Sequence, residues 1–143
     1  MLSIILDFLG LFSTFNTSGF SAFSIFFVNN SGYTTGKVFT TGDIGLDTLT
    51  DFTPTADKLL LSKTTFAALT SIVGNGFSQA TDFAVVEDDF LVETSSAFIV
   101  YNSNSSSLFY NQNGNVPGLG TGAEFAVLIS NPILNSNDFI LVA

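Results

Sequence analysis

The sequence contains no cysteine, no histidine, no tryptophan and no arginine. Without cysteine, neither a disulfide framework nor a thiolate metal site can form. Without histidine and cysteine, the Ser-His and Cys-His nucleophile pairs and the His-based zinc sites are also excluded. No spacing singles out a pair of carboxylates for glycoside hydrolysis. We therefore expect a protein that is not an enzyme.

Basic charge is scarce as well, because the only basic residues are Lys37, Lys58 and Lys63. They face 12 acidic residues, which gives a formal net charge of -9. Binding of nucleic acid or of an anionic membrane surface depends on clustered lysine and arginine, so both partners are disfavoured. A divalent cation, which relieves the repulsion between carboxylates, is the partner that this charge balance favours.

Long apolar runs are also missing. The first 28 residues are interrupted by Asp7, Gly10, Asn16 and Gly19, so they contain no stretch of about twenty apolar residues for a membrane span. No basic residue precedes Lys37, so a secretory signal peptide is not expected either. Only 10% of the residues are charged, whereas 46% are hydrophobic and 17 are phenylalanine, which indicates a packed core and not a disordered acidic chain.

Two regions differ in character. Residues 1–41 are rich in Phe, Ser and Gly and are expected to pack on the main domain, which comprises residues 42–143. Apolar runs separated by turn residues predict an all-β fold, a β-roll-like or β-sandwich domain with many short strands and at most one or two short helices. Strands are expected at residues 21–28, 59–61, 82–86, 90–92, 98–101, 108–110, 124–129 and 138–142, and helices at residues 1–12 and 64–71.

Residues 42–50 follow the calcium-repeat pattern G-G-x-G-x-D-x-U-x at Gly42, Gly45, Asp47 and Leu49, with Asp43 in place of the second glycine. In this pattern the glycines allow a tight turn with inward-facing carbonyls, the Asp supplies a carboxylate, and the apolar residue anchors a short strand. Calcium needs six to eight oxygen ligands, so one copy offers only part of a site. The alternative is a glycine-rich turn with a surface Asp.

The context of this repeat resembles a known family. Residues 45–62 are similar to the sequence G-x-D-x-I-x-D-F-x-P-x-x-D-x-I-x-L-S that ends the hemolysin-type (RTX) calcium-binding arrays, and residues 97–102, 108–114, 125–128 and 137–142 resemble the domain that follows such arrays, most of all in cyanobacterial members. The resemblance covers residues 42–143. It implies a non-catalytic terminal module that caps the β-roll of a secreted protein, located outside the cell or on its surface.

The resemblance also implies ligands and partners. Asp47 and Asp51 match the acids that help to bind the last calcium of the array, Asp57 is a further candidate, and Asp43 departs from the pattern. The C-terminal residues match the uncleaved signal read by a type I secretion exporter, and residues 138–142 also read as a closing strand.

Other features leave alternatives open. No further calcium repeat is recognisable before residue 41, so the chain is either a fragment of a longer repeat protein or a stand-alone relative. The Phe-rich residues 1–28 and the expected strand edges are compatible with a structural or adhesive protein that self-assembles. Residues 111–115 echo the loop D-x-D-G-N with Asn in place of both acids, and they are predicted to form a plain turn, as is the acidic run 87–89.

Overall fold

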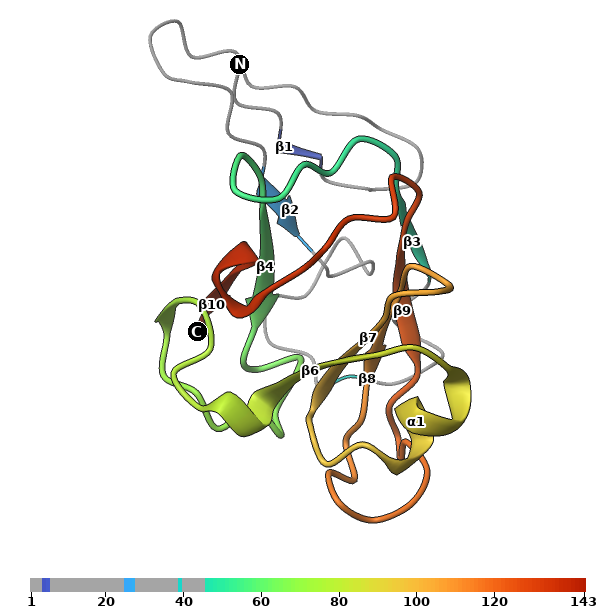
Figure 1. The fold of residues 1–143 in the computed structure, drawn as a ribbon. Coiled ribbons are helices and arrows are strands. Elements are labelled where there is room, and N and C mark those ends of the chain that lie inside the picture. The colour runs from blue at the N-terminus through green and yellow to red at the C-terminus, as the bar shows by residue number, and fades with distance from the viewer. Residues whose placement is uncertain (1–3, 6–24, 28–38, 40–45) are drawn as a thin grey trace, which may run out of the picture.

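The computed structural model describes residues 4–5, 25–27, 39 and 46–143. Their strands form two five-stranded sheets (Figure 1). The first sheet has the order β1 (Ile4–Ile5), β2 (Ile25–Phe27), β4 (Lys58–Ser62), β10 (Phe139–Val142), β5 (Gly74–Asn75). Its first four strands are parallel to one another, and β5 runs antiparallel to β10.

The second sheet contains the remaining strands and mixes both directions. Its order is β3 (Asp47–Leu49), β9 (Glu124–Leu128), β8 (Ser107–Tyr110), β7 (Ile99–Asn102), β6 (Phe83–Val86). The two outer pairs, β3 with β9 and β6 with β7, are parallel, whereas the central pairs are antiparallel. A β-bulge between Leu108 and Phe109 shifts the register of β8 against β9. The strands at the two ends of this sheet, β3 and β6, therefore each have one described neighbour.

One hydrophobic core joins the two sheets. Leu59 of β4 and Leu141 of β10 belong to the same buried cluster as Ile99 of β7 and Phe125 of β9. The side chains of the first sheet thus pack against those of the second, as in a β-sandwich. Burial also raises the pKa of the Tyr110 phenol, which lies in this core and accepts a hydrogen bond from the backbone of residue 68.

Helical structure is limited to three short pieces within the described residues: the α-helix α1 (Asp89–Thr94) and the 3-10 turns η1 (Ala80–Asp82) and η2 (Ser136–Asp138). The prediction of an all-β fold with little helix is therefore confirmed. The division of the chain at residue 41 stays a prediction, because only short pieces of the first region are described.

The strand expected at residues 90–92 is wrong, since these residues lie in α1. Asp88 caps this helix: its carboxylate accepts a hydrogen bond from the backbone N–H of Leu91 at 2.8 Å. Of the three apolar residues only Val92 is buried, whereas Phe90 is 72% exposed. A helix on the surface needs only about one buried side chain per turn, and Val92 supplies it here. The N-cap at Asp88 therefore favoured a helix over the strand that the apolar run predicted.

The helix expected at residues 64–71 is also wrong, because this segment forms turns. Two of its backbone N–H groups, those of Phe66 and Leu69, bond to carbonyls three or four residues before them, but three others bond to distant side chains. Ala68 donates to the hydroxyl of Tyr110 at 2.9 Å, and Thr70 and Ser71 donate to the carboxylate of Asp82 at 2.8 and 2.7 Å. At these three positions tertiary hydrogen bonds therefore take the place of helical ones.

The first region is described only in part. The helix expected at residues 1–12 is wrong at Ile4–Ile5, which form β1, and the rest of it lies outside the described residues. The strand expected at residues 21–28 is confirmed at Ile25–Phe27, which form β2 and pair with β4.

Candidate functional site

The end of residues 42–50, which follow the calcium-repeat pattern, is built into the second sheet. Asp47, Thr48 and Leu49 form β3, in parallel register with Ala126 to Leu128 of β9. Burial alternates along the strand, so Leu49 and Asp47 face inward while Thr48 faces outward. Leu49 and the following Phe52 belong to the core and fix this segment in place.

Two of the predicted calcium ligands lie in different surroundings. Asp47 is 5% exposed and lies on the buried side of β3. Asp51 is exposed and lies in the bend that follows the strand, where its backbone carbonyl accepts a hydrogen bond from the hydroxyl of Thr53. Asp51 is therefore the member of the pair whose carboxylate solvent ions can reach directly.

Asp57, the third predicted ligand, closes a turn. Its Oδ2 accepts a hydrogen bond from the backbone N–H of Thr53 at 2.7 Å. Within the same turn, Thr55 has a positive φ of 71° and donates its N–H to Oδ1 of Asp138 at 3.2 Å. The Asp57 carboxylate thus closes the loop between β3 and β4, and the Asp138 carboxylate holds this loop to the segment that leads into β10 (Figure 1). The fourth predicted ligand, Asp43, lies outside the described residues.

Two buried acids that were not predicted as calcium ligands, Asp82 and Asp138, also bind backbone groups. Asp82 accepts hydrogen bonds from the N–H groups of Thr70 and Ser71 and from the Thr70 hydroxyl. Asp138 accepts further hydrogen bonds from the N–H and the side-chain amide of Asn135, both at 2.8 Å. A carboxylate with two or three such donors is stabilised without a counterion.

The 111–115 loop is a turn, as predicted, and its first residue has a structural role. Asn111 is fully buried, and its Nδ2 donates to the carbonyl oxygens of Ser95, Ala97 and Gly114. A carboxylate has no proton to donate when ionised. Asn at this position is therefore explained by the three carbonyls around it, which need a donor.

The acidic run 87–89 is not a plain turn throughout. Asp88 caps α1 and Asp89 is its first residue, where its Oδ1 accepts a hydrogen bond from Nδ2 of Asn102 at 2.9 Å. All three acids of the run are exposed. A negative charge at the start of a helix is favourable because of the helix dipole.

The donor set for calcium is incomplete in the described part of the chain. No three acidic side chains gather there into a group that could hold a metal ion. Asp51 could contribute a carboxylate, but six to eight oxygen ligands are required. The remaining ligands would have to be backbone carbonyls, water or residues outside the described ranges, so the predicted site stays a prediction.

A search of protein-family models, of curated proteins and of solved structures finds no match for the chain. Among the helices of the described residues, none has the length and apolar character needed to cross a bilayer.

Proposed function

We propose that the chain is a non-catalytic, calcium-responsive terminal module of a secreted, hemolysin-type repeat protein. The observation that supports this most directly is the position of β3. The segment that ends the calcium repeat is an end strand of the second sheet, and its apolar residues are anchored in the core. A repeat that precedes β3 would thereby connect to the domain through a rigid strand, and repeat arrays need such an end.

Calcium bound at the bend after β3 would stabilise the folded chain. Asp51 is exposed there, beside a strand that is fixed in the sheet. An ion that binds the folded chain but not the unfolded chain stabilises the fold by RT ln(1 + [L]/Kd), about 1.4 kcal/mol at ten times Kd. Extracellular sites typically bind calcium with a Kd of about 10⁻⁴ to 10⁻³ M, so the module would respond outside the cell and not inside.

The C-terminal residues support export in the same proposal. Residues 139–142 form β10, which lies between β4 and β5 in the first sheet. A type I exporter would read these residues in the unfolded chain, before β10 is buried. The same apolar residues can therefore act first as a signal and then as a strand.

The test is a thermal melt of the whole chain in calcium, in magnesium and in chelator at equal ionic strength. We expect calcium alone to raise the melting temperature by about 3–6 °C. Asp51→Asn should remove this increase. Glu87→Gln is the matched control, because it removes one exposed negative charge elsewhere and should leave the increase intact.

Equal melting temperatures in calcium and magnesium would contradict the proposal. So would an equal loss of the calcium response in Asp51→Asn and in Glu87→Gln, since that result indicates charge screening and not a site.

The second candidate is a structural or adhesive protein that self-assembles through its sheet edges. It is favoured by β3 and β6, which end the second sheet without a further strand in the described residues. Exposed strand edges can pair with other chains. Sedimentation at increasing protein concentration separates the two candidates, because only the second predicts assembly of the purified chain without calcium.

A further inference from the structure

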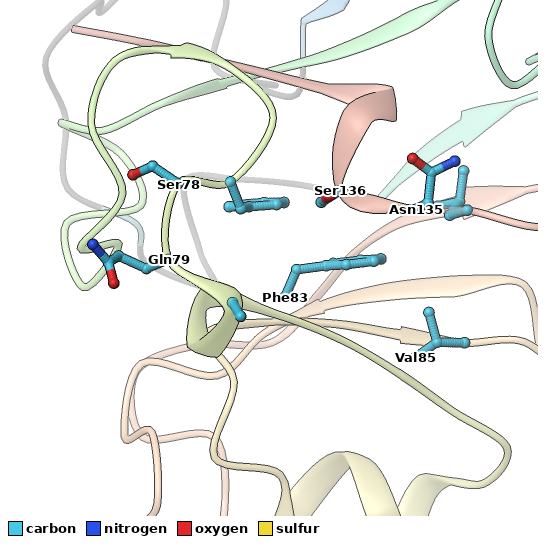
Figure 2. Close-up of a pocket in the computed structure, with 9 residues that line it drawn as sticks. Ser78, Gln79, Phe83, Val85, Asn135 and Ser136 are labelled. Atoms are coloured by element: carbon cyan, nitrogen blue, oxygen red, sulfur yellow. The ribbon is translucent and has the colours of Figure 1, made fainter.

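An apolar groove lies beside the end strand β6. It has a volume of about 500 Å³ and runs between the connection from β5 to β6 and the segment that leads into η2 (Figure 2). Phe77, Phe83, Val85 and Leu134 form its apolar lining. In Figure 2 the ring of Phe83 lies inside the groove, and the polar end of Gln79 points away from it. The interior is therefore apolar and the rim is polar.

The floor of the groove is held rigidly. The rings of Phe77 and Phe83 are stacked with centroids 5.6 Å apart and planes within 3°. Both rings also contact Phe139 of β10, with centroids 4.9 and 5.0 Å apart, and Phe139 is fully buried. Phe77 and Phe83 themselves are only partly buried, so this three-ring cluster presents apolar surface to a ligand. None of the residues that line the groove is charged.

The groove continues along a strand edge. β6 is the last strand of the second sheet, with β7 as its described neighbour, and none of its residues is fully buried, in contrast to those of β7. Phe83 and Val85 are two positions apart on β6, so their side chains lie on the same face of the strand, and both line the groove. A strand added to β6 would place every second side chain beside these two.

The acidic residues near β6 favour a partner strand that carries a basic residue. Immediately after β6 the chain carries the exposed acids Glu87, Asp88 and Asp89. The net charge of -9 adds a long-range negative field, which repels a second copy of the same chain. A partner with a basic residue at the end of an apolar stretch is attracted instead.

We propose that β6 and this groove bind an extended segment of another polypeptide, in which apolar side chains alternate with polar ones and a basic residue stands at the end. The segment pairs its backbone with the edge of β6 that faces away from β7, where the described strands add no neighbour, as in other cases of β-strand addition. Its apolar side chains enter the groove over Phe83 and Val85, and its basic residue lies near Glu87. This inference goes beyond the proposed calcium response and does not depend on it.

The probe is a short synthetic peptide in which valine alternates with threonine and a lysine stands at each end, labelled with a fluorophore. Fluorescence polarisation with the whole chain measures its Kd. Val85→Lys should weaken binding about tenfold or more, because it places a cation in the groove and on the strand edge. Val85 is 49% exposed, so this variant should fold, which its circular dichroism spectrum checks.

Ile129→Lys is the matched control. It introduces the same charge at another exposed apolar residue, 60% exposed, next to β9, and should leave the Kd unchanged. A peptide with glutamate at both ends should bind several-fold more weakly at low salt, and the difference should shrink as salt rises, because screening shortens the range of the attraction. Prolines at two successive central positions of the peptide should abolish binding, since one of the two N–H groups that they remove must point toward β6.

Three results would overturn the proposal. The first is equal weakening by Val85→Lys and Ile129→Lys, which points to general charge effects. The second is unchanged binding of the proline peptide, which excludes strand pairing. The third is self-association of the unliganded chain that Val85→Lys abolishes, because the partner of β6 would then be a second copy.

Discussion

At the scale of single residues, several acids of this chain bind its own backbone. Asp57, Asp82 and Asp138 are buried and accept hydrogen bonds from N–H groups of turns. The acidic composition favoured a cation partner, yet at these three positions the positive ends of N–H dipoles surround the carboxylate. A count of acidic residues thus overstates the number of carboxylates that can take up calcium.

A substitution at Asn111 tests whether a buried carboxylate is tolerated where the backbone offers carbonyl oxygens and no N–H group. Asn111→Asp would place a carboxylate against three carbonyl oxygens in a fully buried position. We expect a loss of about 3 kcal/mol in the free energy of unfolding, because a buried charge would have no donor. Urea unfolding measures this loss.

Asn115→Asp is the control, since it makes the same change at an exposed residue of the same loop and should cost less than about 0.5 kcal/mol. If calcium raised the free energy of unfolding of Asn111→Asp but left that of the wild type unchanged, the loop with an acid at this position would bind a cation. That result would contradict the structural role assigned to Asn111.

The predicted calcium site stays a prediction, and the sequence pointed only to residue types around the segment that contains it. The pattern at residues 42–50 predicted a short strand anchored by its apolar residue, and β3 is that strand. Glycine spacing and an apolar anchor are local signals, so they can be read from the sequence. The role of Asp57 in its turn and the bond from Thr55 to Asp138 were not predictable, since the second bond joins residues 83 positions apart. The groove at Phe83 left no signal either, because its lining comes from separate segments.

At the scale of elements, the predicted strands with clear turn residues on both sides were confirmed. Those at residues 59–61, 98–101, 108–110 and 124–129 correspond to β4, β7, β8 and β9 within one or two residues at each end. The errors at residues 64–71 and 90–92 have opposite causes. In the first segment distant acceptors competed for the backbone, and in the second a local cap was overlooked.

The strand β10 carries the element-scale prediction. Leu141 is fully buried in the shared core, whereas its neighbour Ile140 is only partly buried. Leu141→Ala should cost about 3 kcal/mol through lost packing and a cavity, and Ile140→Ala should cost clearly less. Chemical denaturation of both variants checks this order. Equal costs would mean that the two side chains are equally buried, against the alternation of burial along β10.

At the scale of the whole molecule, the charge balance opposes compaction. The net charge of -9 is spread over a chain with three lysines, so the folded state carries more self-repulsion than the unfolded state. Sodium chloride should therefore raise the melting temperature by a few degrees between about 0.01 M and 0.15 M, as the screening length falls from about 30 Å to about 8 Å. A melting temperature that falls or stays constant would show that repulsion is unimportant.

This prediction also sets the condition for any calcium measurement. A divalent salt screens charge as well as binding to sites, so calcium effects have meaning only against magnesium at equal ionic strength.

The all-β fold was predictable from the sequence, because turn residues and β-branched residues are distributed along the whole chain. The sheet order was not, since it pairs β2 with β4 and β4 with β10 across long connections.

The pairing of β4 with β10 has a consequence for synthesis. β4 is complete at Ser62, but its partner β10 ends at Val142. A ribosome releases residues in order, so β4 can pair early with β2 but lacks its second neighbour until residue 142 has left the exit tunnel. During this interval the nascent chain stays open to chaperones and to any translocation machinery, and it can close its first sheet only afterwards.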